Sequence, residues 1–468
     1  MTQILVILCF AAVHLRDEYA YASGLSPFTS GAITLAGLGL IWLSHLGAMA
    51  LFGHRIDRTG SWRAVVAADR ATLAANVCGA IWFATFVLVG GLLDGVRALV
   101  GDTILLDELL ALLIPLAFLA AVWWSYEPID RRLGEAALIR RLDEGGEVYL
   151  PQGRSAFVVR RLRHHVLLSG VPLTIIIGWS ELIGWISHAW LSHWPPSAGE
   201  ALRIAGVLAI FVVSPAIMRR VWGAKYLDGS GIAALVDDMR RLHKVRVRGP
   251  LLLPTGGTSV NAAILGVMWP FRYVLFSDAL LEHLSPVHIE AVTAHEIAHV
   301  RRHHIPWLGA LMLSIILLLG GMMGLVIDFW PVSLPAWLVE FTPEIAGMAS
   351  LAIGALAFGY VSRRFEWQAD AFAAAHVSRR AACDVVTPEG ALALSDALDR
   401  VARLNHMPQD RFFFRHGSIR TRRRRLAALV GTPLDAMPID QEVSRIKNAI
   451  GVMVLLLVVA LALLTAVG

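Results

Sequence analysis

The chain has 468 residues, of which 56% are hydrophobic and only 16% are charged, and its formal net charge is +5. An average soluble domain is about 25% charged, so this composition excludes an ordinary soluble protein, a disordered chain and a disulfide-rich secreted scaffold. The excess of arginine does not indicate nucleic-acid binding, because in an apolar chain it typically marks cytoplasmic loops that contact anionic lipid headgroups. We expect a membrane protein with lipids, but no nucleic acid, among its partners.

Apolar stretches of the length needed to cross a bilayer recur along the whole chain. The start, residues 1–15, is short and lacks a basic flank, so it is either a further span, which we favour, or a cleaved signal segment. With it, the sequence predicts about nine transmembrane helices. The eight clear stretches lie at about 31–53, 74–93, 106–124, 166–187, 201–218, 306–327, 346–362 and 449–467.

Arginine-rich and arginine-poor segments alternate between these stretches, which predicts that the N-terminus lies in the cytoplasm. Two long polar blocks fall on the same, cytoplasmic side. Because the hairpin between them returns the chain to the side it left, the two blocks are expected to form one domain at the membrane surface. The predicted parts are a transmembrane region at 1–218, a first block at 219–305, the hairpin at 306–362, a second block at 363–448 and a last helix at 449–468.

The first block contains the string His295-Glu296-Ile-Ala-His299 in a segment of helical periodicity. Ser285 suits the N-cap of this helix and Pro286 its first position. Residues four apart share one face of a helix, so the two histidines can reach one zinc ion, and Glu296 lies where it can take a proton from zinc-bound water. The arrangement is typical of zinc peptidases.

A third protein ligand is expected from the second block, because the residues after His299 do not continue into the third-histidine pattern of metzincins. Glu366 is the best candidate, and Asp370 shares its helix face. Asp370 is then placed to accept a hydrogen bond from a ligating histidine and to hold its tautomer. Glu340 and Glu344 compete by sequence distance, but the predicted topology places them across the membrane.

The chain resembles the integral-membrane zinc metallopeptidases that include the HtpX heat-shock protease and the CAAX prenyl protease. The resemblance rests on Val292–Val300, on Glu366–Phe372, which is similar to the family's ExxAD element, on Asn261–Gly266 and on His416–Arg422. In the last of these, Gly417 stands where the family has proline. The similarity covers about residues 222–430, so it leaves the preceding spans unexplained.

The resemblance implies that one zinc ion is held by His295, His299 and Glu366, with Asp370 behind them. It also implies that Glu296 is the general base and then the proton donor.

Further roles are implied nearer the substrate. His416, together with Arg422, would stabilise the oxyanion of the tetrahedral intermediate. Asn261 and Ala262 lie in an expected edge strand, whose free backbone groups would hold an extended peptide, although a purely structural strand is an open alternative.

The predicted fold is therefore a mostly α-helical, polytopic membrane protein with a cytoplasm-facing α+β gluzincin-type domain. The predicted function is zinc-dependent endoproteolysis of membrane-associated proteins or peptides in a bacterial inner membrane, in the manner of HtpX in quality control. Two alternatives stay open: a sensor-transducer metallopeptidase that cleaves a repressor, and a non-catalytic membrane scaffold. The sequence carries no signal for the oligomeric state, the cleavage preference, latency or the purpose of the N-terminal spans.

Overall fold

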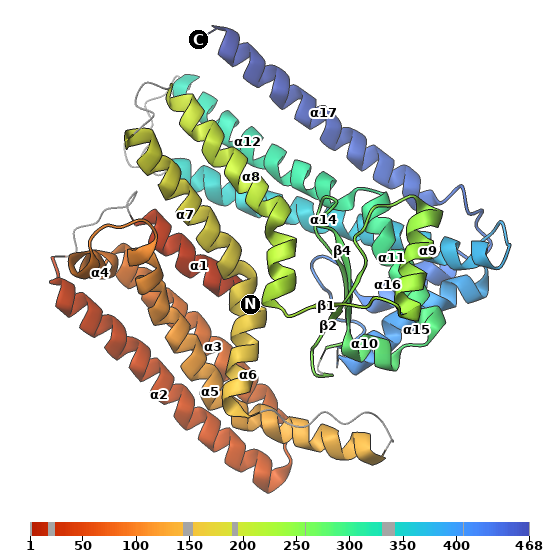
Figure 1. Ribbon diagram of the computed structural model, residues 1–468, viewed down its shortest axis with the longest axis horizontal. Helices are drawn as coiled ribbons and strands as arrows, with labels where there is room; N and C mark the ends of the chain where they lie inside the picture. The colour runs from red at the N-terminus through yellow and green to blue at the C-terminus, as the bar shows by residue number, and fades with distance from the viewer. Residues whose placement is uncertain are drawn as a thin grey trace. The chain divides into compact units, whose positions relative to one another are not determined.

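The computed structural model describes residues 2–16, 24–143, 153–189, 195–257, 259–329, 342–405 and 407–467, and it divides into two compact units, Met1–Trp222 and Gly223–Gly468. Most described residues are helical, and a small sheet lies in the second unit (Figure 1). The mostly helical fold expected from the composition is confirmed.

All the regular secondary structure described in the first unit is helical. Its helices are α1 (Thr2–Leu15), α2 (Pro27–Thr59), α3 (Trp62–Leu88), α4 (Leu92–Val100), α5 (Leu106–Asp143), α6 (Arg154–Arg161), the π-helical turn η1 (Leu162–Val166), α7 (Leu167–Ala189) and α8 (Pro196–Val221).

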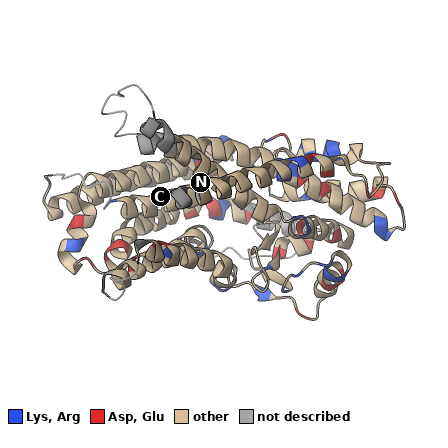
Figure 2. Cartoon of the chain, turned by 90° about the horizontal axis from the view of Figure 1, so that it is seen from above, with Lys and Arg blue, Asp and Glu red and all other residues tan. Residues whose placement is uncertain are grey.

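Seven helices within the described residues are long and apolar enough to cross a membrane. Figure 2 shows how few charged residues the long helices carry over most of their length. The polytopic architecture is therefore confirmed. The seven candidate spans are Pro27–Thr59, Trp62–Leu88, Leu106–Glu135, Arg154–Ser187, Ser197–Val221, His304–Met322 and Pro438–Ala460.

The other two predicted spans take a different form. The segment 1–15 becomes α1, which at 14 residues is shorter than the roughly 20 residues that a bilayer requires. The segment 346–362 lies inside a longer helix, which over its described residues is not among the seven candidate spans. The predicted loops at 188–200 and 328–345 fall partly outside the described residues.

Some polar side chains inside the first unit are hydrogen-bonded to neighbouring segments. His45 of α2 lies 2.9 Å from Ser125 of α5 through Nδ1 and 3.0 Å from Thr72 of α3 through Nε2. Glu181 of α7 accepts a hydrogen bond of 2.7 Å from the backbone N–H of Leu105. Since lipid offers no partner to a buried polar group, these bonds join the helices of this unit.

The second unit contains a four-stranded sheet in the order β1-β2-β4-β3. The central strand β4 is buried along its whole length, because it runs between parallel β2 and antiparallel β3. Strand β3 lies at the edge, where the sequence predicts an edge strand. The strands are β1 (Lys225–Tyr226), β2 (Pro250–Leu253), β3 (Ala262–Leu265) and β4 (Tyr273–Ser277).

Helices of the second unit surround this sheet and include two of the candidate spans, which lie within α12 and α17 (Figure 1). The predicted last span, 449–467, is the later part of α17. The helices are α9 (Gly231–His243), α10 (Asp278–His283), α11 (Pro286–Arg301), α12 (His304–Phe329), α14 (Thr342–Arg380), α15 (Pro388–Leu404), α16 (Ile419–Ala428) and α17 (Pro438–Val467).

Helix α11 begins where the sequence predicts, with Ser285 at the N-cap and Pro286 in the first turn. It packs against α14, and small buried side chains line both helices. Ala294 and Ala298 of α11 and Ala369 of α14 are completely buried. Because alanine lets two helix backbones approach closely, polar side chains that extend from one helix can reach those of the other.

Candidate active site

Three potential metal ligands converge between α11 and α14. His295 and His299 lie one turn apart on α11, and their Nε2 atoms are 3.3 Å from each other. Glu366 of α14 places Oε2 3.5 Å from Nε2 of His295 and Oε1 3.7 Å from Nε2 of His299. Within the described part of the chain, these residues form the one group of histidine, cysteine and carboxylate side chains that could hold a metal ion.

The spacing of these three residues fits zinc. A tetrahedral ion with bonds of about 2.0–2.1 Å requires its ligand atoms to lie about 3.4 Å apart. The two histidine nitrogens are 3.3 Å apart, and Glu366 presents a different oxygen to each of them, Oε2 at 3.5 Å and Oε1 at 3.7 Å. Two imidazoles and one carboxylate are also a donor set typical of catalytic zinc sites, in which three protein ligands leave a fourth position open.

Asp370 contacts this cluster on the side of His295 that faces away from the other two ligands, and Arg422 binds Asp370. Oδ1 of Asp370 lies 3.0 Å from Nδ1 of His295, although the angle is poorer than that of an ideal hydrogen bond. Arg422 donates to both Asp370 oxygens, at 2.8 and 2.6 Å, and its Nη1 is 3.4 Å from Glu366. Arg422 is only 7% exposed, so its guanidinium is committed to the two carboxylates. The sequence had placed it at the substrate.

The electrostatics differ between the two histidines. Burial by itself lowers the pKa of His295, but Asp370 and Glu366 outweigh burial and raise that pKa to about 10. Burial lowers the pKa of His299 to about 4. Burial also disfavours ionised carboxylates, yet His295 and His416 hold the pKa of Glu366 well below its usual range, and Arg422 holds that of Asp370 down. The site therefore has two carboxylates poised to bind a cation.

Glu296 lies between the histidines and the edge of the sheet. Its Oε2 accepts a hydrogen bond of 3.0 Å from the backbone N–H of Ile264 in β3. Burial raises the pKa of Glu296, with Glu366 adding to the effect. A partly buried carboxylate with a raised pKa, held by one oxygen, is suited to taking up a proton and giving it back.

His416 reaches the same cluster from the turn before α16. Its Nδ1 lies 2.9 Å from Oε1 of Glu366, while the side chain is half exposed. The next residue, Gly417, has a φ of +73°. Proline is restricted to a φ near −65°, so the turn in this chain requires glycine where the resembling family has proline. The substitution is compatible with His416 still reaching Glu366.

Asn261 and Ala262 lie where β3 begins. The backbone N–H of Asn261 donates to Ser277 at 2.9 Å, and Ala262 pairs with Phe276 of β4. Asn261 is exposed. Ala262 is thus the first residue of the edge strand, and Asn261 directly precedes it. The same strand carries Ile264, whose backbone N–H binds Glu296.

From the sequence, His303 and His304 are expected to form the polar end of the helix before Pro306, but the structure places His304 at the site. His304, at the start of α12, is 1% exposed, and its Nδ1 lies 2.9 Å from Nδ1 of His299. Its position five residues after His299 was the available signal, but a polar helix end explained it equally well. Of the competing carboxylates, Glu340 and the side chain of Glu344 lie outside the described residues.

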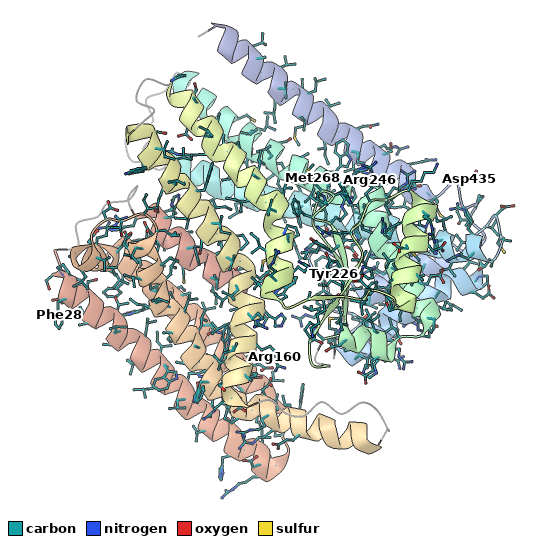
Figure 3. The ribbon with its side chains drawn as sticks, viewed as in Figure 1. Phe28, Arg160, Tyr226, Arg246, Met268 and Asp435 are labelled. Carbon is teal, nitrogen blue, oxygen red and sulfur yellow. The ribbon has the colours of Figure 1, made fainter. Side chains whose placement is uncertain are left out.

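A small pocket, with room for about one water molecule, adjoins His299 at the end of β3. Arg272 closes one side, donating to the carbonyl oxygens of Arg246 and Val267. Figure 3 labels Arg246 and Met268, which belong to the two loops that Arg272 joins. The pocket is lined by Gly266, Val267, Arg272, His299, Val300, His303, Ile305 and Pro306.

Comparison with known proteins identifies the domain that holds this site. Residues 253–429 match peptidase family M48, a range that includes all nine residues singled out from the sequence. No curated protein matches the chain. The crystal structure of Ste24p from S. mikatae is similar over 85% of this chain and 98% of that chain, with 13% sequence identity and a TM-score of 0.45.

Residues 253–429 are thus a peptidase family M48 domain. The chain is a multi-pass membrane protein that carries a metallopeptidase domain.

Proposed function

We propose that this protein is a zinc-dependent endopeptidase that hydrolyses peptide bonds of membrane-associated proteins. The observation that supports the proposal most strongly is the convergence of His295, His299 and Glu366 at tetrahedral spacing, with Glu296 beside them. We assign the first three residues as ligands of one zinc ion, and Asp370 as the residue that orients His295.

Zinc at this position would supply a Lewis acid that activates water and polarises the peptide carbonyl. Glu296 would accept the proton of the attacking water and later deliver it to the departing amine. Its raised pKa favours both steps, because a base that holds its proton more firmly at neutral pH can also serve as the acid. The hydrogen bond from Ile264 holds Oε2 and leaves the other oxygen for this transfer.

His416 would stabilise the negative charge that develops on the carbonyl oxygen. With Nδ1 directed at Glu366 and half of the side chain exposed, its other ring nitrogen is available to a bound substrate. Arg422 is assigned instead to Asp370, because its guanidinium is buried against that carboxylate.

The edge strand β3 is proposed to hold the substrate. Its outer side is free of a further strand in the described sheet, so an extended peptide starting near Asn261 and Ala262 could add to it.

Membrane-associated substrates are favoured by where the candidate spans start. The span His304–Met322 begins five residues after His299, and Pro438–Ala460 belongs to the same unit. We further propose a bacterial inner membrane, with the site facing the cytoplasm, and an HtpX-like role in membrane protein quality control or processing. The support for these finer points is the alternation of arginine along the sequence and the resemblance given above.

The test compares detergent-purified wild type with Glu296→Gln on casein and on a model membrane protein, with bound zinc quantified in both. We expect one zinc per chain in each protein and a loss of about 10²–10⁴-fold in kcat/KM for the variant. Absence of zinc from wild type would refute the ligand assignment. Stoichiometric zinc without cleavage would instead favour a latent sensor-transducer that cleaves one specific repressor.

A further inference from the structure

A line of buried polar side chains runs from the proposed ligand His299 to the start of the C-terminal helix. Nδ1 of His299 is 2.9 Å from Nδ1 of His304, whose Nε2 is 2.8 Å from Oε1 of Gln368 on α14. Gln368 donates from Nε2 to Oδ1 of Asp440 at 2.6 Å, and Arg302 donates to Oδ2 of the same carboxylate at 2.9 Å. Asp440 lies in the first turn of α17.

The chemistry of these groups assigns a direction to every hydrogen bond in the line. An ionised carboxylate only accepts, so Asp440 requires the amide nitrogen of Gln368 to face it. The amide oxygen then faces His304, whose Nε2 must carry the proton. Nδ1 of the neutral His304 is therefore an acceptor, and His299 donates to it from Nδ1. The other ring nitrogen of His299, Nε2, then carries no proton, and its lone pair faces His295 and Glu366.

Resting on the zinc site proposed above, we propose that Asp440 acts through Gln368 and His304 to hold His299 in the tautomer that binds the metal. These three are positioning residues, since none of them lies among the proposed ligands. Asp440 also lies beyond residue 429, where the M48 domain ends. The C-terminal helix α17 is therefore an integral part of the metal site and not only a membrane anchor.

Because these side chains are buried, reversing the direction of one hydrogen bond in the line would leave a polar group without a partner. His304 is 1% and Gln368 is 3% exposed, so water cannot readily replace a partner that turns the wrong way. Two other contacts fix the far end: Arg302 holds Asp440, and Lys447 of α17 donates to the backbone oxygen of Arg302.

The substitution Asp440→Asn is expected to reverse the line. Arg302 would keep the single amide oxygen at position 440, so the amide nitrogen would face Gln368. Gln368 would then turn its amide nitrogen towards Nε2 of His304, and the proton of His304 would move to Nδ1. The N–H groups of His304 and His299 would then face each other, so the hydrogen bond between them would be lost. Loss of a residue that orients a ligating histidine typically costs about 10–100-fold in metal affinity.

A second substitution is expected to restore the original direction of the hydrogen bond between His304 and His299, although the residues at positions 368 and 440 differ from those of the wild type. In the double variant Asp440→Asn/Gln368→Glu, the carboxylate at position 368 accepts from His304 and from the amide at position 440. Glu442→Gln is a matched control, because it makes the same carboxylate-to-amide change at a 2.9 Å hydrogen bond to Arg364 between the same helices, α17 and α14, outside this line.

The experiment measures zinc affinity of the full-length protein in detergent by chelator competition, with thermal unfolding of the zinc-free forms alongside. We expect Asp440→Asn to bind zinc about 10–100-fold more weakly, and the double variant and Glu442→Gln to bind it within about threefold of wild type. Wild-type affinity in Asp440→Asn overturns the proposal, as does a double variant that stays as weak as the single one while unfolding at the wild-type temperature. Tight zinc binding by wild type without peptidase activity would contradict the proposed function alone.

Discussion

Two clusters in the second unit contain the same residue types and share the helices α11 and α14, yet they differ in chemistry. One is the proposed metal site, with His295 and His299 on α11 and Glu366 on α14. The other, the His243–His376–Glu290 chain, takes one residue each from α9, α14 and α11. Both combine two histidines with one glutamate.

The difference lies in what each ring nitrogen faces. In the His243–His376–Glu290 chain, Nε2 of His243 is 2.9 Å from Nδ1 of His376, and Nε2 of His376 is 3.1 Å from Glu290. Glu290 in turn accepts from Arg380 at 3.0 Å. Both nitrogens of His376 are occupied, so the groups form a line of bonded pairs. At the metal site, by contrast, Nδ1 of His295 faces Asp370 and Nδ1 of His299 faces His304. This leaves Nε2 of each histidine to converge with a carboxylate oxygen of Glu366.

The comparison teaches that a count of histidines and carboxylates does not define a metal site. A metal site is defined by ligand atoms that converge on one point without being used in other hydrogen bonds. This convergence depends on the residues that hydrogen-bond to the other side of each ligand. Each of the predictions that follow pairs a change at the metal site with its counterpart in the other cluster.

The largest expected effect comes from deleting a ligand. The His299→Ala variant should lose zinc affinity by on the order of 100- to 1000-fold, since a binding free energy of about 10–16 kcal/mol is shared among few ligands. The His376→Ala variant should keep one zinc per chain. Elemental analysis after dialysis against a chelator of intermediate strength measures both, and equal zinc loss in the two variants would contradict the distinction between the clusters.

The pH dependence of zinc binding should be nearly as large. Because Asp370 and Glu366 raise the pKa of His295 to about 10, this ring carries a proton at neutral pH that zinc must displace. Affinity should therefore rise about tenfold per pH unit between about pH 7 and 9. His299, with its pKa lowered to about 4 by burial, should contribute no proton in this range.

Calorimetry in buffers of different ionisation enthalpy measures the protons released when zinc binds. The same slope should appear in His376→Ala, since the pKa of His376 is lowered by burial and the ring is neutral at these pH values. A flat affinity between pH 7 and 9 would show that His295 is not protonated in the zinc-free site.

Intermediate effects are expected from the carboxylates behind the histidines. Asp370→Asn keeps an acceptor near His295 but removes the charge, and should lower zinc affinity by about 10–100-fold. Glu290→Gln makes the same chemical change behind His376 and should leave zinc affinity unaltered. Chelator competition on both variants decides the matter, and a loss of affinity in Glu290→Gln would indicate that the two clusters are coupled through α11.

The last prediction concerns acid stability, and it affects folding but not zinc binding. Burial lowers the pKa of His243 to about 4, and His376 contributes to the shift. Below about pH 6.5 the unfolded chain takes up a proton that the folded chain takes up only near pH 4, so stability is lost as the pH falls through this window. At about 1.4 kcal/mol per pKa unit, the loss is at most about 3 kcal/mol.

The variant His243→Phe should lack this part of the acid destabilisation, because phenylalanine does not titrate and can pack against Phe372, as His243 does. Thermal unfolding of the zinc-free proteins between pH 7 and 4 measures the effect. The difference in melting temperature between variant and wild type should move in favour of the variant as the pH falls. A constant difference would mean that His243 does not titrate in this window.

Much of the candidate site follows from patterns within single helices. The spacing of His295 and His299 places both on one face of α11, and Glu366 and Asp370 share a face of α14 for the same reason. The hairpin between the two polar blocks predicted that α11 and α14 belong to one domain. Ser285 and Pro286 marked the start of α11. These features depend on neighbours in the chain, and a sequence displays them directly.

The partners across helices could not be read in this way. Arg422 stands in a run of four arginines, and no periodicity singles out the one that pairs with Asp370. His304, Gln368 and Asp440 come from three helices, and their alignment depends on how α12, α14 and α17 pack. Of the nine predicted spans, seven correspond to candidate spans within the described residues.

The sequence alone therefore specified the class of chemistry: an apolar, membrane-spanning chain and the residue types of a zinc peptidase at helical spacing. Tertiary packing decided which of these donors converge and which partner holds each of them. The physical reason is that periodicity along a helix determines which residues share a face, whereas the direction of a buried hydrogen bond depends on groups that only the folded chain brings together.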